Sequence, residues 1–488
     1  MQSTSLLTTT ALDPFIPSAQ NPWDAEKVRH LYNRMAHGAS PSQIEAGIDL
    51  GPDTLIDDII SQIINDPYPD PPSWADWTWS NYGGNFDLFF THKYEMYIRI
   101  MQRQVDSPFR SKLWMFWHNH FVAEEEVYSC NNYMWSYYEL IRNNLLGNFR
   151  NLVEEMGRNP AMLVYLNGNL NIAQEPNENY ARELMELFTM GENNGYTQDD
   201  IVEVARALTG WQCDMYACTL PYFLPIYHDS TFKTIFGQTG NWGYQDVHNL
   251  IFTQRKNQVA EYICTKIYTY FVNPTPNQEV IDAMAAIFIE DWELEPVFTA
   301  LLKSAHFYEA NQRNTKIKSP TEFFFSLVNT TGLQFPVSIN NEWFGDIFYF
   351  TGELGQYVLN PVDVAGWPGQ RAWVNETTLT LRWSSIGGML FFRMANNNFT
   401  RGELVNLAIA LNEDQENDPE VITQSLIRHF LNTDLDDNLF QSAVAYFKAD
   451  VPQNYFEDGS WNLYYDDVPD QIISLLYFLT RLPEWQLC

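Results

Sequence analysis

Apolar residues recur every three or four positions along most of this 488-residue chain, a spacing typical of helices that bury one face. The pattern is clear through 86–106, 197–211 and 258–272. Gly51 interrupts it between 41–51 and 53–66, which predicts two helices with a break between them. The same pattern predicts helices within 25–38, 108–122, 131–157, 279–289, 294–307, 420–432 and 469–488.

Two stretches, about 212–248 and 355–378, have no helical period and contain Pro, Gly, Asn and aromatic residues. Alternation typical of strands is short and sparse. We therefore predict a mainly α fold, a large multi-helix orthogonal bundle with two long loop-rich insertions and little strand. We expect an N-terminal extension over 1–22 and a single large helical domain over 23–488, with a subdivision near 212–250 as the alternative.

The composition supports a large core, because 45% of the residues are hydrophobic and 15% are aromatic. The chain has 61 Asp and Glu against 28 Lys and Arg, a formal net charge of −33. This charge repels phosphate backbones, so we predict no nucleic-acid partner and favour an uncharged or cationic substrate. No cluster of Lys or Arg along the sequence suggests a basic patch, and no apolar run is long enough to predict an integral membrane segment.

The first residues lack a basic start and a sustained apolar region, so the chain as given predicts a soluble, cytoplasmic protein. Removal of a signal peptide would instead make it periplasmic or secreted. Five cysteines are too few for a disulfide framework. Free thiols are the favoured interpretation, and a local bridge between Cys213 and Cys218 is the alternative.

The segment 176–191 carries a polar stripe on an otherwise apolar helix. Asn179, Glu183 and Glu186 stand at positions i, i+4 and i+7, with Arg182 beside them. One interpretation is a structural ion network that joins two helices. The other is a carboxylate site that holds a metal or moves protons. In both cases we expect Glu183 and Glu186 to be shielded from water and paired with an arginine.

Histidines mark two further segments. His118 and His120 would point about 200° apart on a helix, so one helix could not direct both at a single metal, whereas an extended segment could. For either histidine alone, a hydrogen-bonded core histidine is the favoured interpretation. His228, Asp229 and Lys233 lie together in a loop, where they predict either acid–base partners or an ordered Asx turn.

Aromatic residues add candidates for ligand contact. Trp367, Arg371 and Trp373 in "GWPGQRAW" suggest an edge that contacts a sugar or an anion, and buried anchoring of a long loop is the alternative. Trp211 ends the helical pattern of 197–211. The sequence contains no GxSxG elbow, HExxH, P-loop or dinucleotide fingerprint, which argues against the common nucleophile and cofactor classes.

Several stretches along residues 23–488 carry a resemblance. They include "LWMFWHNHFV", "NENYARELMELFTMG", "GYTQDDIVEVARALTGW", "AEYICTKIYTYFV", "KIKSPTEFF" and "VAGWPGQRAWVN". With these stretches in this order, the chain resembles the domain-of-unknown-function 1800 family of bacterial proteins. The resemblance implies a predominantly helical fold and, for many members, export. It implies no reaction, so the function is argued from the residues.

We therefore predict an enzyme, a hydrolase or transferase that acts on a glycan or another uncharged, envelope-associated substrate. Its catalytic residues would share one pocket: His118, His120, His228, Asp229, Glu183 and Glu186. Its substrate-binding residues would be Arg182, Lys233, Trp211, Trp367, Arg371 and Trp373. A divalent metal and a protein partner are compatible with this prediction but not required. The alternative is a non-catalytic cell-envelope binding or assembly protein in which the same residues form structural ion networks.

Overall fold

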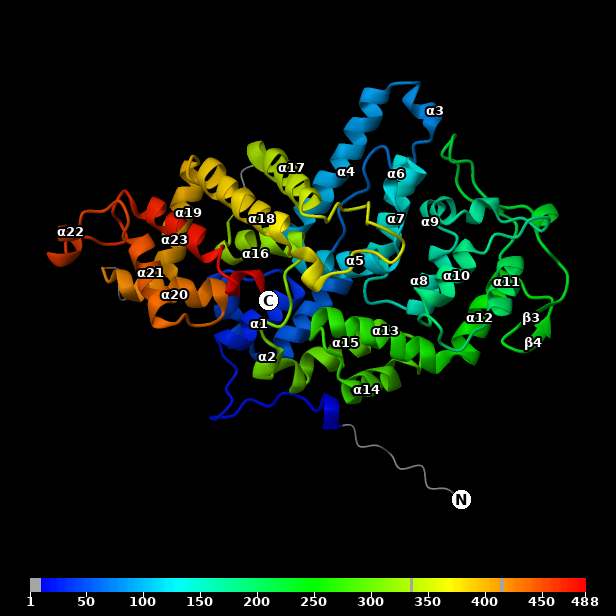
Figure 1. Cartoon of the computed structure of the whole chain (residues 1–488), viewed down its shortest axis with the longest axis horizontal. Helices are drawn as coiled ribbons and strands as arrows, with labels where there is room; N and C mark the ends of the chain where they lie inside the picture. Colours follow the sequence, from blue (N-terminus) through cyan, green and yellow to red (C-terminus); the bar gives the residue numbers. More distant parts are fainter. Residues whose placement is uncertain (1–9, 334–336, 413–416) are drawn as a thin grey trace, which may run out of the picture.

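The protein is built almost entirely from helices (Figure 1). The computed structural model describes residues 10–333, 337–412 and 417–488. Over these residues it has 23 α-helices and four short strands, which confirms the predicted mainly α fold. None of the helices described is both long enough and apolar enough to cross a bilayer.

The N-terminal helices surround α5, which lies near the middle of the molecule and contacts α1, α2, α4 and α7 (Figure 1). Gly51, at φ 76°, bends α2 where the sequence predicts a break. Pro108 separates α4 from α5, since proline suits the first turn of a helix but not its interior. The bounds are α1 Ala25–Met35, α2 Pro41–Asn65, α3 Trp79–Tyr82, α4 Phe86–Asp106, α5 Pro108–His120, α6 Glu125–Tyr128, α7 Asn131–Asn143, α8 Phe149–Met156 and α9 Pro160–Tyr165.

The middle of the chain contains six helices and all the described strands. Thr197 and Asp200 form the predicted capping box at the start of α11. The strands form two antiparallel pairs, β1 with β2 and β3 with β4, in or beside the first loop-rich stretch. The bounds are α10 Asn179–Glu186, α11 Gln198–Ala207, β1 Trp211–Gln212, β2 Tyr222–Phe223, β3 Lys233–Ile235, β4 Gln238–Gly240, α12 Tyr244–Gln254, α13 Lys256–Phe271, α14 Gln278–Phe288 and α15 Leu294–Lys303.

The C-terminal helices form the yellow-to-red end of the molecule in Figure 1. Their bounds are α16 Pro320–Thr331, α17 Val337–Glu353, α18 Glu376–Gly388, α19 Asn398–Ala410, α20 Pro419–Leu431, α21 Asp437–Phe447, α22 Gln453–Glu457 and α23 Val468–Leu479. A π-helix follows α18 at Met389–Met394. Short 3-10 helices are Thr10–Leu12, Gly168–Leu170, Pro225–Tyr227, His306–Tyr308, Ala310–Gln312, Gln370–Trp373 and Glu484–Gln486.

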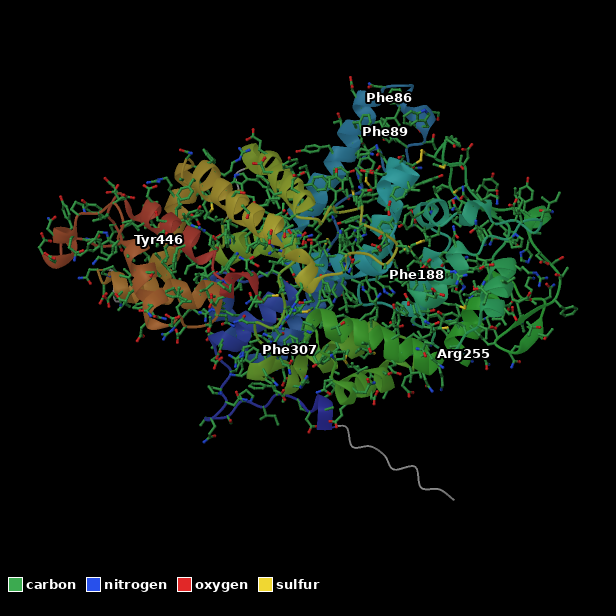
Figure 2. All side chains as sticks on the ribbon, viewed as in Figure 1. Phe86, Phe89, Phe188, Arg255, Phe307 and Tyr446 are labelled. Atoms are coloured by element: carbon green, nitrogen blue, oxygen red, sulfur yellow. A yellow bond between two sulfur atoms is a disulfide. The ribbon has the colours of Figure 1, made fainter. Side chains whose placement is uncertain are left out.

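One hydrophobic core joins these segments, with buried side chains from Phe15 to Trp485. Phe188 and Phe307 are buried in it, whereas Phe86 lies exposed at the tip that α3 and α4 form (Figure 2). Burial of this apolar surface is the main force that holds helices distant in sequence together.

A disulfide between Cys130 and Cys218 ties the first loop-rich stretch to the start of α7. The favoured interpretation of free thiols is therefore wrong for these two cysteines, and so is the local bridge between Cys213 and Cys218. The loop folds back onto α7, where Asn132 and Tyr133 donate hydrogen bonds to loop carbonyl groups and bring Cys218 to Cys130. Cys213 stays free and buried.

Candidate functional site

A cleft of about 390 Å³ opens between α5, α13, α16 and the second loop-rich stretch. This volume lies within the usual range for small-molecule sites. Figure 1 shows α5, α13 and α16 in the central part of the molecule, and the yellow loop before α18 passes over α5 in this view. The lining residues come from four segments that are distant in sequence, within 115–120, 266–274, 316–322 and 356–373.

His120 and Lys266 meet on one wall of the cleft, at the end of α5 and within α13. The Nε2–H group of His120 donates to the carbonyl oxygen of Phe188 at 3.1 Å. Its Nδ1 atom therefore accepts from the ammonium of Lys266, at 3.1 Å. Burial lowers the pKa of His120 well below its usual value and that of Lys266 to about 8. The imidazole of His120 is therefore neutral, and it accepts a hydrogen bond from Lys266, whose pKa lies close to neutral pH.

Lys112, Lys316 and Glu322 form a buried charge group beside this wall. Lys112 donates to Oε1 of Glu322, and Nζ of Lys316 lies 3.9 Å from the same oxygen. The backbone N–H of Ser319 donates to Oε2 at 2.6 Å. Burial alone would raise the pKa of Glu322, but the two ammonium groups outweigh it and hold that pKa well below its usual range. Glu322 is therefore ionised, and both of its carboxylate oxygens already have partners within the protein.

Lys316 and Lys318 stand two residues apart on an extended segment, so their side chains leave it on the same side. An antiparallel bridge between Ile317 and Leu487 holds this segment against the last residues of the sequence. Both lysines are buried, and burial lowers the pKa of each to about 8. Folding thus gathers lysines that form no cluster along the sequence.

Trp367 and Trp373 add aromatic surface to the cleft. Asn119 of α5 fixes this loop, because its side-chain oxygen accepts from the backbone N–H of Trp367 at 2.7 Å. Gly366 has φ 85°, and a Cβ atom there would lie 2.4 Å from that same oxygen. Only glycine permits this close approach of the loop to α5.

His118 lies behind the cleft wall and is fully buried. Its Nε2 atom accepts from the backbone N–H of Leu359 at 3.0 Å, and its Nδ1–H donates to the hydroxyl of Tyr137 at 2.7 Å. Burial lowers its pKa to about 3. Both of its nitrogens are used inside the core, and its ring leaves α5 on a different side from that of His120, as helical geometry predicts.

The polar stripe of α10 lies outside the cleft wall. Arg182 pairs with Glu178 at 2.9 Å and with Glu186 at 3.3 Å, so Glu186 has the predicted arginine partner. Glu183 is half-buried and has no ion pair among the described residues. Burial, followed by repulsion from Glu186, raises its pKa to about 7.

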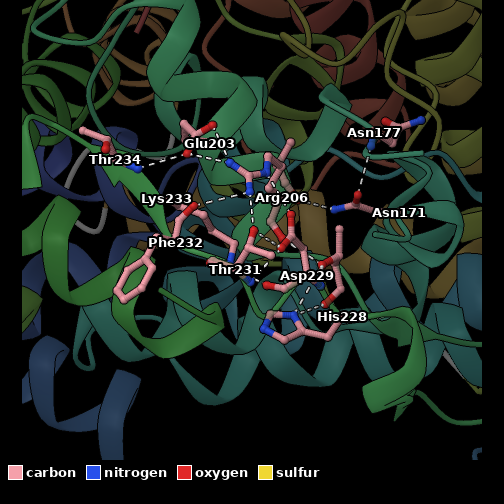
Figure 3. Close-up of polar contacts among 12 residues, drawn as sticks. Asn171, Asn177, Glu203, Arg206, His228, Asp229, Thr231, Phe232, Lys233 and Thr234 are labelled. Carbon is pink, nitrogen blue, oxygen red and sulfur yellow. Dashed lines mark hydrogen bonds and ion pairs between the residues drawn. The ribbon is translucent and has the colours of Figure 1, made fainter. Parts of the chain in front are cut away.

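The loop after β2 forms a second polar cluster around Arg206, which we call the Arg206 cluster: Glu203, Arg206, Asp229, Thr231 and Lys233 (Figure 3). The guanidinium of Arg206 donates to Glu203 at 2.7 Å and to Asp229 at 2.8 Å. Lys233 donates to the backbone carbonyls of Asp229 and Thr231. Burial alone would raise the pKa of Asp229, but hydrogen bonds from Thr231 and Arg206 lower it to about 2.

His228, Trp211 and Arg371 also lie outside the cleft wall. The Nδ1–H of His228 donates to the carbonyl of Thr209 at 3.0 Å (Figure 3). Trp211 packs against Phe223 of the neighbouring strand, with ring centroids 5.6 Å apart. Arg371 is exposed to solvent. The cleft wall therefore brings together three of the predicted site residues, His120, Trp367 and Trp373, and the roles of all the predicted residues stay predictions.

The described residues contain no group of three or more His, Cys, Asp or Glu side chains arranged to hold a metal ion. Sequence reasoning missed Lys266, Lys316 and Glu322 as cleft residues. Two signals could have indicated them. Lys266 interrupts the apolar pattern of 258–272, and "KIKSP" places two lysines on one side of an extended segment in a chain that has few lysines.

Comparison with the curated proteins and with the solved structures finds no match to this chain. The protein family of unknown function DUF1800 matches residues 30–487, nearly the whole chain, and confirms the resemblance noted in the sequence. The chain belongs to the DUF1800 family.

Proposed function

We propose that this protein is an acid–base enzyme, a hydrolase or transferase, that acts on a small molecule held in the cleft. The observation that carries the proposal is the pairing of Lys266 with neutral His120 at the cleft wall. A proton donor or acceptor works best when its pKa lies near the working pH, and Lys266 has a pKa of about 8.

In this proposal Lys266 gives or takes the proton, and His120 is a positioning residue. His120 accepts one N–H of the ammonium and leaves the others for a ligand. Trp367 and Trp373 line the cleft and are largely buried, so what supports the predicted glycan substrate is the apolar contact that their exposed parts offer.

A non-catalytic binding protein is the second candidate function. The Arg206 cluster supports it for the segment around His228, because its two acids and two cations satisfy one another or the backbone. Such a cluster fixes a loop without needing a ligand.

The disulfide supports an oxidising compartment, because such bonds persist mainly outside the reducing cytosol. We therefore propose a periplasmic or secreted location. Titration of free thiols on protein purified from its native host, with and without prior reduction, tests this. A thiol count that does not rise after reduction would contradict it.

Turnover of p-nitrophenyl glycosides, esters and phosphates by the purified protein tests the enzyme proposal. We expect release of nitrophenol from at least one substrate and a fall of about 10²–10⁴-fold in kcat/KM for Lys266→Met, the usual contribution of a general acid or base. Lys256→Met is the matched control, because this lysine is exposed at the start of the same helix.

The pH profile separates a catalytic role from a structural one. In the wild-type protein kcat/KM should change around pH 8, where Lys266 of the free protein titrates, and this change should be absent in Lys266→Met. Absence of turnover across the whole set would favour the binding-protein alternative.

A further inference from the structure

We propose that the substrate carries a phosphate monoester, which binds in the cleft between the ammonium groups of Lys266 and Lys316. This inference rests on the proposed use of the cleft as the active site and names the class of substrate that its walls select. The chemistry and geometry of the cleft point to an acceptor-rich, doubly negative group.

The two ammonium groups have hydrogen-bond donors to spare. Lys266 donates to His120, and Lys316 donates to the carbonyl of Tyr270 near the end of α13. An ammonium has three donors, so each lysine keeps two N–H groups that no described residue accepts at hydrogen-bond distance. Lys266 and Tyr270 are one turn apart on α13, which places both ammonium groups along the same face of that helix.

Two glutamines add neutral donors to the same cleft. The side-chain oxygen of Gln356 accepts from the backbone N–H of Thr321 at 2.8 Å, and that of Gln370 accepts from the N–H of Ile317 at 3.2 Å. These bonds fix which end of each amide is the oxygen. The NH₂ group of each glutamine has no hydrogen-bond partner among the described residues. The cleft therefore offers donors and needs a ligand with several acceptor oxygens.

The charge balance favours a dianion. Glu322 is the only carboxylate side chain among the described lining residues, and it is held by Lys112 and Ser319. The ammonium groups of Lys112, Lys266 and Lys316 thus share one carboxylate side chain, which leaves a surplus of positive charge at the cleft of a chain whose net charge is −33. Buried charges are usually paired, and a phosphate monoester carries about −1.5 to −2 charges at pH 7. Lysine binds phosphate as a point charge, whereas planar carboxylates favour the arginine fork.

Isothermal titration calorimetry on the full-length protein at pH 7.5 tests the inference. The probes are glucose 6-phosphate, ribose 5-phosphate and glycerol 3-phosphate, each paired with its unphosphorylated parent, together with glucuronate and inorganic phosphate. We expect at least one phosphate ester to bind ten times more tightly than its parent, than glucuronate and than inorganic phosphate.

Variants locate the binding group. Lys316→Gln and Lys266→Gln should each weaken the tightest ester at least tenfold and leave the affinity for its parent unchanged, while Lys256→Met should change neither. Should these variants fail to fold, the wild-type protein gives the same test through pH. Affinity for the ester should fall above about pH 8 as both lysines lose their protons.

Arg34 and Cys488 also face Lys316. Three other groups near the two lysines do not cause the loss of affinity above pH 8. His120 and Glu322 titrate well below pH 7, and Lys112 pairs with Glu322. The ammonium of Lys318 lies over the Trp485 ring and also has a pKa of about 8, so Lys318→Met is made to show that the loss of affinity above pH 8 persists without it. The phosphate itself titrates near pH 6 and weakens binding only below that pH.

Three results would overturn the inference: no ester binding more tightly than its parent, glucuronate binding most tightly, or inorganic phosphate binding as tightly as every ester. The last would identify free phosphate as the ligand. Because binding is measured without turnover, loss of catalysis alone would contradict the proposed function and leave phosphate binding standing.

Discussion

The cleft and the Arg206 cluster use the same types of residue and differ in how their charges are matched. Around Arg206, two acids face two cations, and Lys233 is satisfied by backbone carbonyls. In the cleft, Lys266 and Lys316 lie on a wall that has one carboxylate side chain, that of Glu322, and this carboxylate already pairs with Lys112. A cluster that satisfies itself fixes a loop, whereas a cluster with surplus donors and charge is suited to hold a ligand.

The strongest test of this difference removes the carboxylate of the cleft. Glu322→Gln leaves the ammonium of Lys112, which is fully buried, without its counter-charge. We expect a loss of about 3–5 kcal/mol in the free energy of unfolding, measured by urea denaturation at pH 7.

The control for Glu322→Gln is Asp434→Asn, which breaks an exposed pair with Arg428 and should cost about 0–1 kcal/mol. A loss at Glu322 no larger than in this control would show that Lys112 finds another partner and that the cleft has no tight charge balance.

A second variant tests the charge balance of the Arg206 cluster. Asp229→Asn should lower the free energy of unfolding at pH 7 by roughly 2 kcal/mol, because the pKa of Asp229 lies at about 2 in the folded protein and at 3.8 ordinarily. A lowered pKa gives stability that is present above about pH 4 and is lost as pH falls toward 2. The variant and the wild type should therefore converge in acid denaturation curves.

The same variant sharpens the comparison through ligand binding. If the Arg206 cluster only fixes its loop, Asp229→Asn should leave the affinity for the tightest phosphate ester unchanged in calorimetry. A tenfold loss of that affinity would instead place the loop at the ligand, as in the predicted single pocket.

The smallest expected effect is on the free energy of unfolding above pH 8. The folded pKa of Lys316, about 8, lies below its ordinary value of 10.5, so the unfolded chain binds more protons between these values and stability rises with pH. Lys316→Met should remove about 1 kcal/mol of that rise between pH 8 and 9, measured by urea denaturation at each pH. The charged groups that face Lys316 are Glu322, Cys488, Lys112 and Arg34.

Lys256→Met serves as the control for this pH series, since its side chain is exposed. An equal rise in Lys316→Met and in the wild type would mean that Lys316 keeps its ordinary pKa. The cost of burying the Lys316 ammonium would then already be offset within the protein, and the cleft would differ less from the Arg206 cluster.

Local rules predicted the helices well. Asn85 and Pro108 bound α4 where the apolar period begins and ends, and Gly51 bends α2 as expected. These features depend on neighbouring residues alone, so a sequence contains enough information to place them. The predicted division into an extension over 1–22 and one domain over 23–488 stays a prediction.

The site depends on contacts that local rules cannot supply. Lys266 and Lys316 meet only because α13 and the segment before α16 pack together, and Cys130 finds Cys218 across 88 residues. Net charge is a poor guide to the cleft for the same reason, because −33 describes the whole chain and says nothing of where a few lysines gather. The sequence shows the residue types, but it does not show which distant segments pack against one another.

The bridge between Ile317 and Leu487 sets an order of events during synthesis. The ribosome makes Lys316 about 170 residues before Leu487, which at 5–20 residues per second is a delay of roughly 10–30 s. During that interval α5 and α13 can already assemble their side of the cleft, while the segment that carries Lys316 still lacks its bridge to Leu487. A nascent chain should therefore acquire its full binding capacity only after Leu487 has emerged, when the helices that precede it have already been made.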